Sequence, residues 1–140
     1  MKAAAVALIA LIGCTHGMPP ADPRCAGGDP LFQGDDWRDG HDIRVWISTV
    51  GAWAYSESGR SIERGCLDAA ALADVNDALS SATWMQREDH GYRMPCHEPA
   101  MRFHVHDQLV FTSECWVSPD EATATAIVEI FATVNLARGG

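Results

Sequence analysis

The residues best suited to chemistry lie in the segment HGYRMPCHEPAMRFHVHD, residues 90–107. His104 and His106 are two positions apart, and alternate side chains of a β-strand point to the same side of a sheet. Two imidazoles at this spacing can bind one metal ion, with His97 or Glu98 as the third ligand. The alternative interpretation is a solvated strand face whose intervening residues belong to the core.

The N-terminus has the layout of an export signal. Lys2 is followed by an apolar run over residues 3–12, which is shorter than the roughly 20 apolar residues that a membrane-spanning helix needs. The run ends in LIGC, residues 11–14, which resembles the lipobox of bacterial lipoproteins. This resemblance implies that residues 1–13 are a signal peptide and that Cys14 is lipidated. The alternative is an ordinary signal peptide with a chance cysteine near its cleavage site.

The lipobox resemblance also implies a location. Two or three acyl chains on Cys14 hold a protein stably at a membrane. Thr15 rather than Asp follows Cys14, which in lipoproteins of Gram-negative bacteria implies the outer membrane. We therefore expect an exported protein with a lipid anchor in the outer membrane, facing either the periplasm or the cell surface.

The charge of the chain narrows the choice of partners. The only lysine, Lys2, lies in the signal segment. The chain after residue 13 therefore contains nine arginines, no lysine and all 19 acidic residues. The resulting formal charge of −10 repels nucleic acid and anionic lipid, so neither is an expected partner. The expected partners are membrane lipid, through the acyl chains on Cys14, and an envelope protein or a protease.

Four cysteines remain once Cys14 is assigned to the lipid: Cys25, Cys66, Cys96 and Cys115. An even number of cysteines in an exported protein indicates disulfides. Four cysteines can pair in three ways, and the sequence does not choose among them. A redox enzyme is not expected because the chain lacks a Cys-x-x-Cys motif.

Nothing in the sequence indicates catalysis. The chain has no Gly-x-Ser-x-Gly motif, and without a lysine in the exported part it cannot form a Schiff base or a Walker-type phosphate site. Cys96 and His97 are adjacent, so on a strand they would face opposite sides, and an oxidising compartment would consume the thiol. We predict that the protein is not an enzyme and needs no cofactor.

Two tryptophans are candidates for a binding surface. Trp46 falls on the strand face opposite Ile43 and Val45, and Trp53 lies in a segment rich in Gly and Ala. Exposed indoles are common anchors in protein interfaces. The alternative is that both side chains belong to the core.

The N-terminal part of the mature chain predicts a linker. Residues 14–41 contain four prolines and many Gly and Asp residues, a composition that cannot bury a core. We expect this segment to be a flexible tether between the lipid and a disulfide-bonded domain over residues 42–137.

The first half of the domain predicts two strands and a helix. The segment DIRVWISTVGAWAY (42–55) is β-branched and aromatic, which favours a strand. SESG (56–59) is typical of a turn, and RSIERGC (60–66) would be the returning strand. Asp68 would cap a helix over residues 69–82.

The second half repeats this order. Residues 100–116 predict a hairpin with its turn at Asp107-Gln108, and the sequence SPDE (118–121) predicts a helix start with Ser118 as the cap. The order is therefore ββαββα. We predict an α+β fold in which two helices pack on one face of a four-stranded antiparallel sheet.

The outline over residues 42–137 also resembles emfourin-type small proteins, which include a bacterial inhibitor of thermolysin-like metalloproteases. The shared features are a Ser/Gly-rich segment after the first strand, a helix rich in Leu and Ala, and a final hairpin and helix. The resemblance implies a small α+β fold and protease inhibition.

Three functional hypotheses follow. The main one is a lipid-anchored envelope protein that binds a partner without catalysis. The first alternative is an emfourin-like inhibitor of a metalloprotease. The second is a periplasmic protein that binds a metal through the histidine segment.

Overall fold

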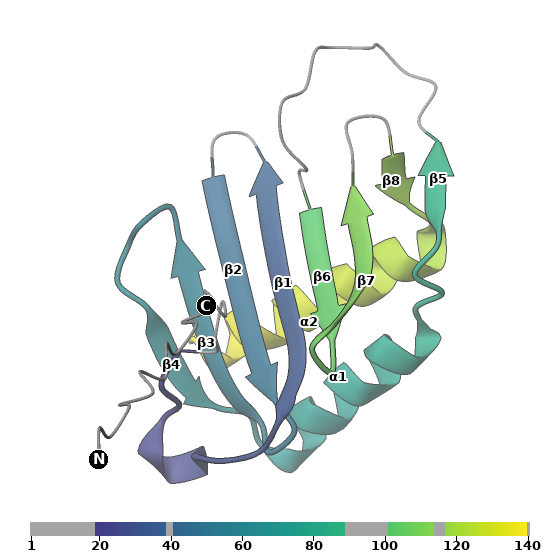
Figure 1. The fold of residues 1–140 in the computed structure, drawn as a ribbon. Coiled ribbons are helices and arrows are strands. Elements are labelled where there is room, and N and C mark those ends of the chain that lie inside the picture. Colours follow the sequence, from purple (N-terminus) through teal and green to yellow (C-terminus); the bar gives the residue numbers. More distant parts are fainter. Residues whose placement is uncertain (1–18, 39–40, 89–100, 114–116, 140) are drawn as a thin grey trace, which may run out of the picture.

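The computed structural model describes residues 19–38, 41–88, 101–113 and 117–139. Two helices, α1 (Ala69–Ser81) and α2 (Glu121–Ala137), pack against each other and against one face of a six-stranded antiparallel sheet (Figure 1). The strand order is β4-β3-β2-β1-β6-β7. These strands are β1 (Pro30–Arg38), β2 (His41–Ser48), β3 (Ala52–Glu57), β4 (Glu63–Cys66), β6 (Met101–Val105) and β7 (Gln108–Ser113).

Three further elements lie at the ends of this layer. The short strands β5 (Gln86–Glu88) and β8 (Val117–Pro119) pair with each other beyond β7. A 3-10 helix, η1 (Pro23–Cys25), precedes β1 and lies beside β4. Neither of the two described helices is long and apolar enough to cross a membrane.

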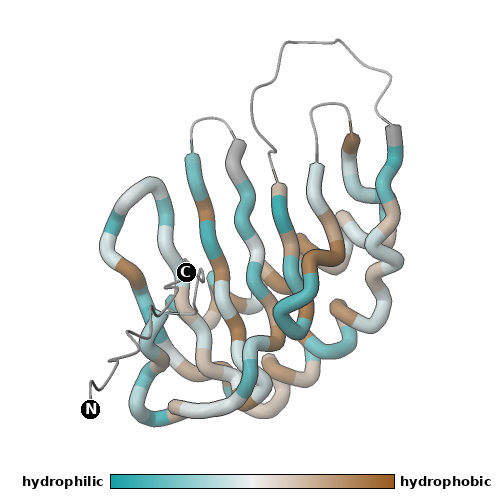
Figure 2. The backbone as a smooth tube through the Cα atoms, in the orientation of Figure 1, coloured by the Kyte–Doolittle hydropathy of each residue, from teal (hydrophilic) through white to brown (hydrophobic). Residues whose placement is uncertain are grey.

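The core lies between the sheet and the helices. Alternate residues of the central strands face the helices, and the alternation of apolar and polar residues is visible along β2 in Figure 2. Val45 and Ile47 of β2 and Ile130 of α2 are fully buried members of one apolar cluster. The rings of Phe32 and Phe103 stack across β1 and β6 with their centroids 5.9 Å apart. Burial of this cluster is the main favourable contribution to folding.

A glycine on the edge strand β4 makes room for a tryptophan of the core. A Cβ atom added to Gly65 would lie 2.6 Å from Cζ2 of Trp53, its cross-strand neighbour on β3. The indole therefore occupies the space beside Gly65 on β4, and a side chain at that position would displace it.

The tether prediction is wrong for residues 30–38. Pro30–Arg38 forms β1, which pairs with β2 on one side and with β6 on the other in the middle of the sheet. The composition of this segment is that of a linker, but Leu31 and Phe32 are 3 % and 1 % exposed, so tertiary burial overrides local composition. The sheet accordingly has six strands rather than the predicted four.

The predicted strand over residues 42–55 is two strands. The chain turns at residues 49–51, where Gly51 adopts a positive φ of 84° and donates its N–H to the carbonyl of Ser48. Only glycine adopts such a backbone conformation without strain. The ββαββα order is therefore not confirmed, because the described part of the chain before α1 contains four strands.

Of the two predicted helix caps, the one for α1 is confirmed and the one for α2 is wrong. Asp68 caps α1, and its carboxylate accepts a hydrogen bond from the N–H of Ala71. The cap of α2 is Asp120 and not Ser118, because Val117–Pro119 pairs with β5 as a strand. The hairpin between β6 and β7 turns one residue earlier than predicted, at His106 and Asp107, which have φ values of 47° and 61°.

Candidate functional site

The candidate site lies on the face of the sheet opposite the helices, which we call the open face. Strand register places two rows of side chains there. One row contains Trp46 on β2, Gln33 on β1 and His104 on β6. The next row contains Arg44, Asp35 and Arg102 on the same three strands. The open face of the central strands therefore combines an indole with charged side chains and an imidazole.

Three buried polar atoms on the open face have no hydrogen-bond partner among the described residues. They are Nε1 of Trp46, Oδ1 of Asp35 and Nδ1 of His104, which occupy adjacent strands. Trp46 is 8 % exposed and lies outside the apolar cluster of the core. Buried polar groups are nearly always paired in folded proteins, and leaving one unpaired costs about 1–3 kcal/mol. A fourth such atom among the described residues, Nε1 of Trp53, lies in the core, so the open face is distinguished by having three of them on adjacent strands.

Asp35 is the acidic member of the second row, on the middle strand β1 between Arg44 and Arg102. Its Oδ1 lies 3.8 Å from Nε of Arg44, which is itself bound more closely to Asp42 at 3.1 Å. Burial raises the pKa of the Asp35 carboxyl, and the nearby Arg44 guanidinium opposes that rise only in part. A partner that donates a hydrogen bond to Asp35 would stabilise its charged form.

The two tryptophans predicted as a binding surface lie on opposite faces of the sheet. Trp53 is 4 % exposed and belongs to the core beneath the helices, so it is not available to a partner. Trp46 lies on the open face, but its ring is buried rather than presented to solvent. Its contribution to binding would come from the Nε1–H donor after neighbouring side chains move.

The predicted histidine metal site is not assembled by the described residues. His104 is on β6, but the strand ends at Val105 and His106 begins a turn with a positive φ, so the alternation of a strand does not extend to it. His97 lies outside the described residues. The side chains that the structure does bring within reach of a single ion do not include His104 or His106.

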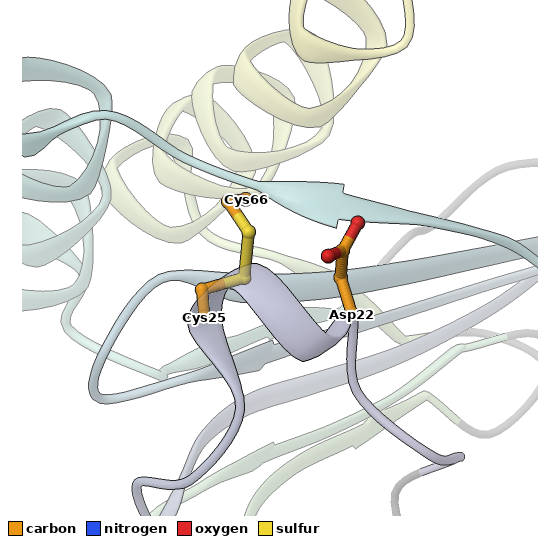
Figure 3. Close-up of side chains that lie close together, drawn as sticks. All are labelled: Asp22, Cys25 and Cys66. Carbon is orange, nitrogen blue, oxygen red and sulfur yellow. A yellow bond between two sulfur atoms is a disulfide. The ribbon is translucent and has the colours of Figure 1, made fainter.

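The group close enough to hold an ion, within the described part of the chain, is Asp22, Cys25 and Cys66, whose ligand atoms lie within 4.8 Å of one another (Figure 3). Cys25 and Cys66 form a disulfide with a Cα–Cα distance of 5.9 Å. Both sulfur atoms are therefore engaged, and neither is a thiolate that could bind a metal.

The same disulfide selects one of the three pairings left open by the sequence. It joins η1 to the end of β4 across 41 residues. Cys96, Cys115 and the lipidation candidate Cys14 lie outside the described residues, so a second disulfide and the lipid remain predictions.

The carboxylate of Asp22 has its own partners. It accepts hydrogen bonds from the backbone N–H and from the guanidinium of Arg24. These bonds lower the pKa of Asp22 to about 2. A negative charge is therefore held next to the disulfide at all ordinary pH values.

Sequence reasoning missed Gln33, Asp35 and Arg102 as site residues. The first two lie in the segment interpreted as a tether, and Arg102 acquires its role only through pairing with that segment. The available signal was the apolar pair Leu31-Phe32, which is only a weak indication of a strand because the residues that follow, QGDD (33–36), show no alternation of apolar and polar residues.

No protein-family model matches the chain, and no curated protein or solved structure is significantly similar to it.

Proposed function

We propose that this protein is a lipid-anchored protein of the bacterial envelope that binds a partner through the open face of its sheet, without catalysis. The observation that carries the binding site is a group of three buried polar atoms, on Trp46, Asp35 and His104 of adjacent strands, which accept or donate no hydrogen bond within the described part of the chain. A partner that pairs them would add hydrogen bonds that no other described residue makes to these atoms.

The lipid anchor rests on the LIGC sequence at residues 11–14. If Cys14 carries the lipid, the chain from there to Cys25 spans at most about 40 Å when fully extended. Cys25 is joined to β4 by the disulfide, so the folded domain would remain close to the membrane surface. The expected partner is a neighbouring envelope protein; inhibition of a metalloprotease is the alternative that the emfourin resemblance supports.

The lipid is tested by the mass of the protein extracted from membranes. The expected mass is that of a chain beginning at Cys14 with two or three acyl chains, and Cys14→Ser should remain unprocessed and unlipidated. A mass without lipid would contradict the anchor. It would not bear on the binding site, which the next experiment tests.

The binding site is tested with a photo-crosslinking amino acid at Arg102, on the open face, and at Ser61, an exposed residue before β4, as the matched control. We expect a discrete crosslinked complex in the native envelope from position 102 and none from position 61. Complexes of equal yield from both positions, or none from position 102, would refute the proposal.

A conservative variant separates binding from folding. Trp46→Phe removes an Nε1–H that has no hydrogen-bond partner among the described residues and keeps an aromatic ring. Relief of this buried donor offsets the cavity left by the smaller ring, so the free energy of unfolding should change by no more than about 1 kcal/mol. Crosslinking from position 102 should nevertheless decrease. Unchanged crosslinking in a stable Trp46→Phe protein would show that this donor is not used.

A further inference from the structure

The helix layer has an unusual charge distribution. Neither α1 nor α2 contains a lysine, arginine or histidine. With their N-capping residues the two helices carry six carboxylates, none of which takes part in an ion pair found among the described residues. They are Asp68, Asp74, Asp77, Asp120, Glu121 and Glu129. The C-capping residue of α2, Arg138, is a cation, but it is bound to Glu63 at 2.6 Å and lies over the ring of Tyr55.

An apolar stripe crosses this acidic layer. Val128 and Leu136 of α2 are 67 % and 72 % exposed, and they are the most exposed large apolar residues of the described chain. The exposed Ala132 lies between them. Residues four apart share one face of a helix, so these three side chains form a continuous line along α2.

A shallow open groove lies beside the end of this stripe, between the first turns of α1 and the last turn of α2. Its walls are apolar at Leu67, Ala70 and Leu136 and acidic at Asp68 and Asp74. The C-terminus of α2, at which the helix dipole favours cations, also borders it. The alkyl stem of a lysine or arginine suits the apolar walls, and its charged end suits the two carboxylates.

We propose that the outward face of α1 and α2 is a second docking surface, and that its occupant is a basic amphipathic helix of another protein. Apolar residues of that helix cover Val128 and Leu136, and one of its basic side chains enters the groove beside Asp74. Charge complementarity selects this occupant. A second copy of the same face, or an anionic membrane, would place like charges against the six carboxylates.

This surface is separate from the site of the proposed function, because the helices and the open face lie on opposite sides of the sheet (Figure 1). Each proposal can therefore be tested without reference to the other. If both hold, the protein links two partners at the membrane.

The test uses the full chain carrying Cys14→Ser, solubilised in mild detergent, and a fluorescent 18-residue helical peptide of Leu, Ala and Lys with one apolar face. Two control peptides have Glu in place of Lys, or the same composition in scrambled order. Binding measured by fluorescence anisotropy should require both the lysines and the apolar face, and should weaken as salt is raised.

Matched variants separate docking from general charge attraction. Asp74→Asn and Leu136→Ser should each weaken binding of the lysine peptide by about tenfold, which corresponds to roughly 1.4 kcal/mol. Asp107→Asn and Leu109→Ser remove the same charge and a similar apolar side chain from the β6–β7 hairpin, where Leu109 is 54 % exposed. These two controls should leave binding unchanged.

Three results would overturn the proposal. The first is equal loss of binding in the hairpin controls, which would indicate non-specific attraction. The second is equal binding of the scrambled peptide. The third is self-association of the unmodified chain, measured by sedimentation, that Leu136→Ser abolishes, because the occupant would then be a second copy.

Discussion

Asp22 and Arg24 set the charge around the disulfide at the scale of single residues. Reduction begins when an external thiolate attacks one sulfur atom, and it releases the other sulfur as a thiolate. Both events place negative charge near the Asp22 carboxylate, whose oxygen lies within 4.8 Å of the two sulfur atoms. The carboxylate should therefore slow reduction, and the guanidinium of Arg24, which pairs with it at 2.8 Å, should partly offset that effect.

We predict that Asp22→Asn speeds reduction of the Cys25–Cys66 disulfide by dithiothreitol several-fold and that Arg24→Gln slows it. Asparagine caps η1 as well as aspartate does, so the first substitution removes charge with little change of structure. The reduction rate is measured by alkylation and mass spectrometry at low and high salt. Equal rates in the two variants would contradict the electrostatic explanation.

Position 65 requires glycine, because the Trp53 ring occupies the space that a side chain there would need. We predict that Gly65→Ala lowers the free energy of unfolding by about 1–3 kcal/mol, because the added Cβ would lie 2.6 Å from the Trp53 ring and force the core to shift. Urea denaturation followed by tryptophan fluorescence measures the change. Arg64→Ala, at the neighbouring exposed position, should change stability by less than about 0.5 kcal/mol.

Asp120 and Ser118 offer a comparison at the scale of elements, because they are the observed and the sequence-predicted caps of α2. Asp120 accepts hydrogen bonds from the N–H of Thr123 and from the hydroxyl of Thr83. It thus joins α2 to the segment that follows α1. We predict that Asp120→Ala lowers the urea midpoint whereas Ser118→Ala leaves it nearly unchanged. The reverse order would mean that the helix begins at Ser118.

The Asp120 cap also predicts a pH dependence. Hydrogen bonds from Thr123 and Thr83 lower the pKa of Asp120 below its ordinary value of 3.8. The cap therefore stabilises the fold fully above that ordinary value, and its contribution is lost as the pH falls through the lowered pKa of the folded state. Thermal melts below pH 4 should show a smaller difference between Asp120→Ala and the unmodified chain than melts at pH 7.

The disulfide acts at the scale of the whole molecule, because it joins the segment before the central strand β1 to the edge strand β4. Its two cysteines are 41 residues apart. Loop entropy for that separation predicts a loss of about 2–4 kcal/mol in the free energy of unfolding when both are replaced by serine. Urea denaturation of Cys25→Ser/Cys66→Ser measures it. A loss below about 0.5 kcal/mol would mean that the bond does not restrict the unfolded chain.

The distribution of charge is the other property of the whole molecule. The helix sequences bring acidic residues without cations to one side of the sheet, whereas Arg44 and Arg102 lie with Asp35 on the other. The overall negative charge was evident from composition. Its separation into an acidic helix layer and a mixed-charge open face depends on which side of the sheet the helices occupy.

The sequence by itself determined the features that depend on near neighbours along the chain. The mixed α+β class with two helices on an antiparallel sheet was predicted, and so were the extent of α1 to within one residue and its Asp68 cap. Helix hydrogen bonds and caps join residues three or four positions apart, so a single segment contains the information that specifies them.

Only the tertiary structure decided the central strand, the faces of the tryptophans and the candidate site. β1 pairs Phe32 with Val105, 73 positions away, and its own segment has the composition of a linker. The helices cover the face that holds Trp53 and leave Trp46 on the other. Strand pairing and the choice of buried face minimise the free energy of contacts between distant segments, so no local pattern contains them.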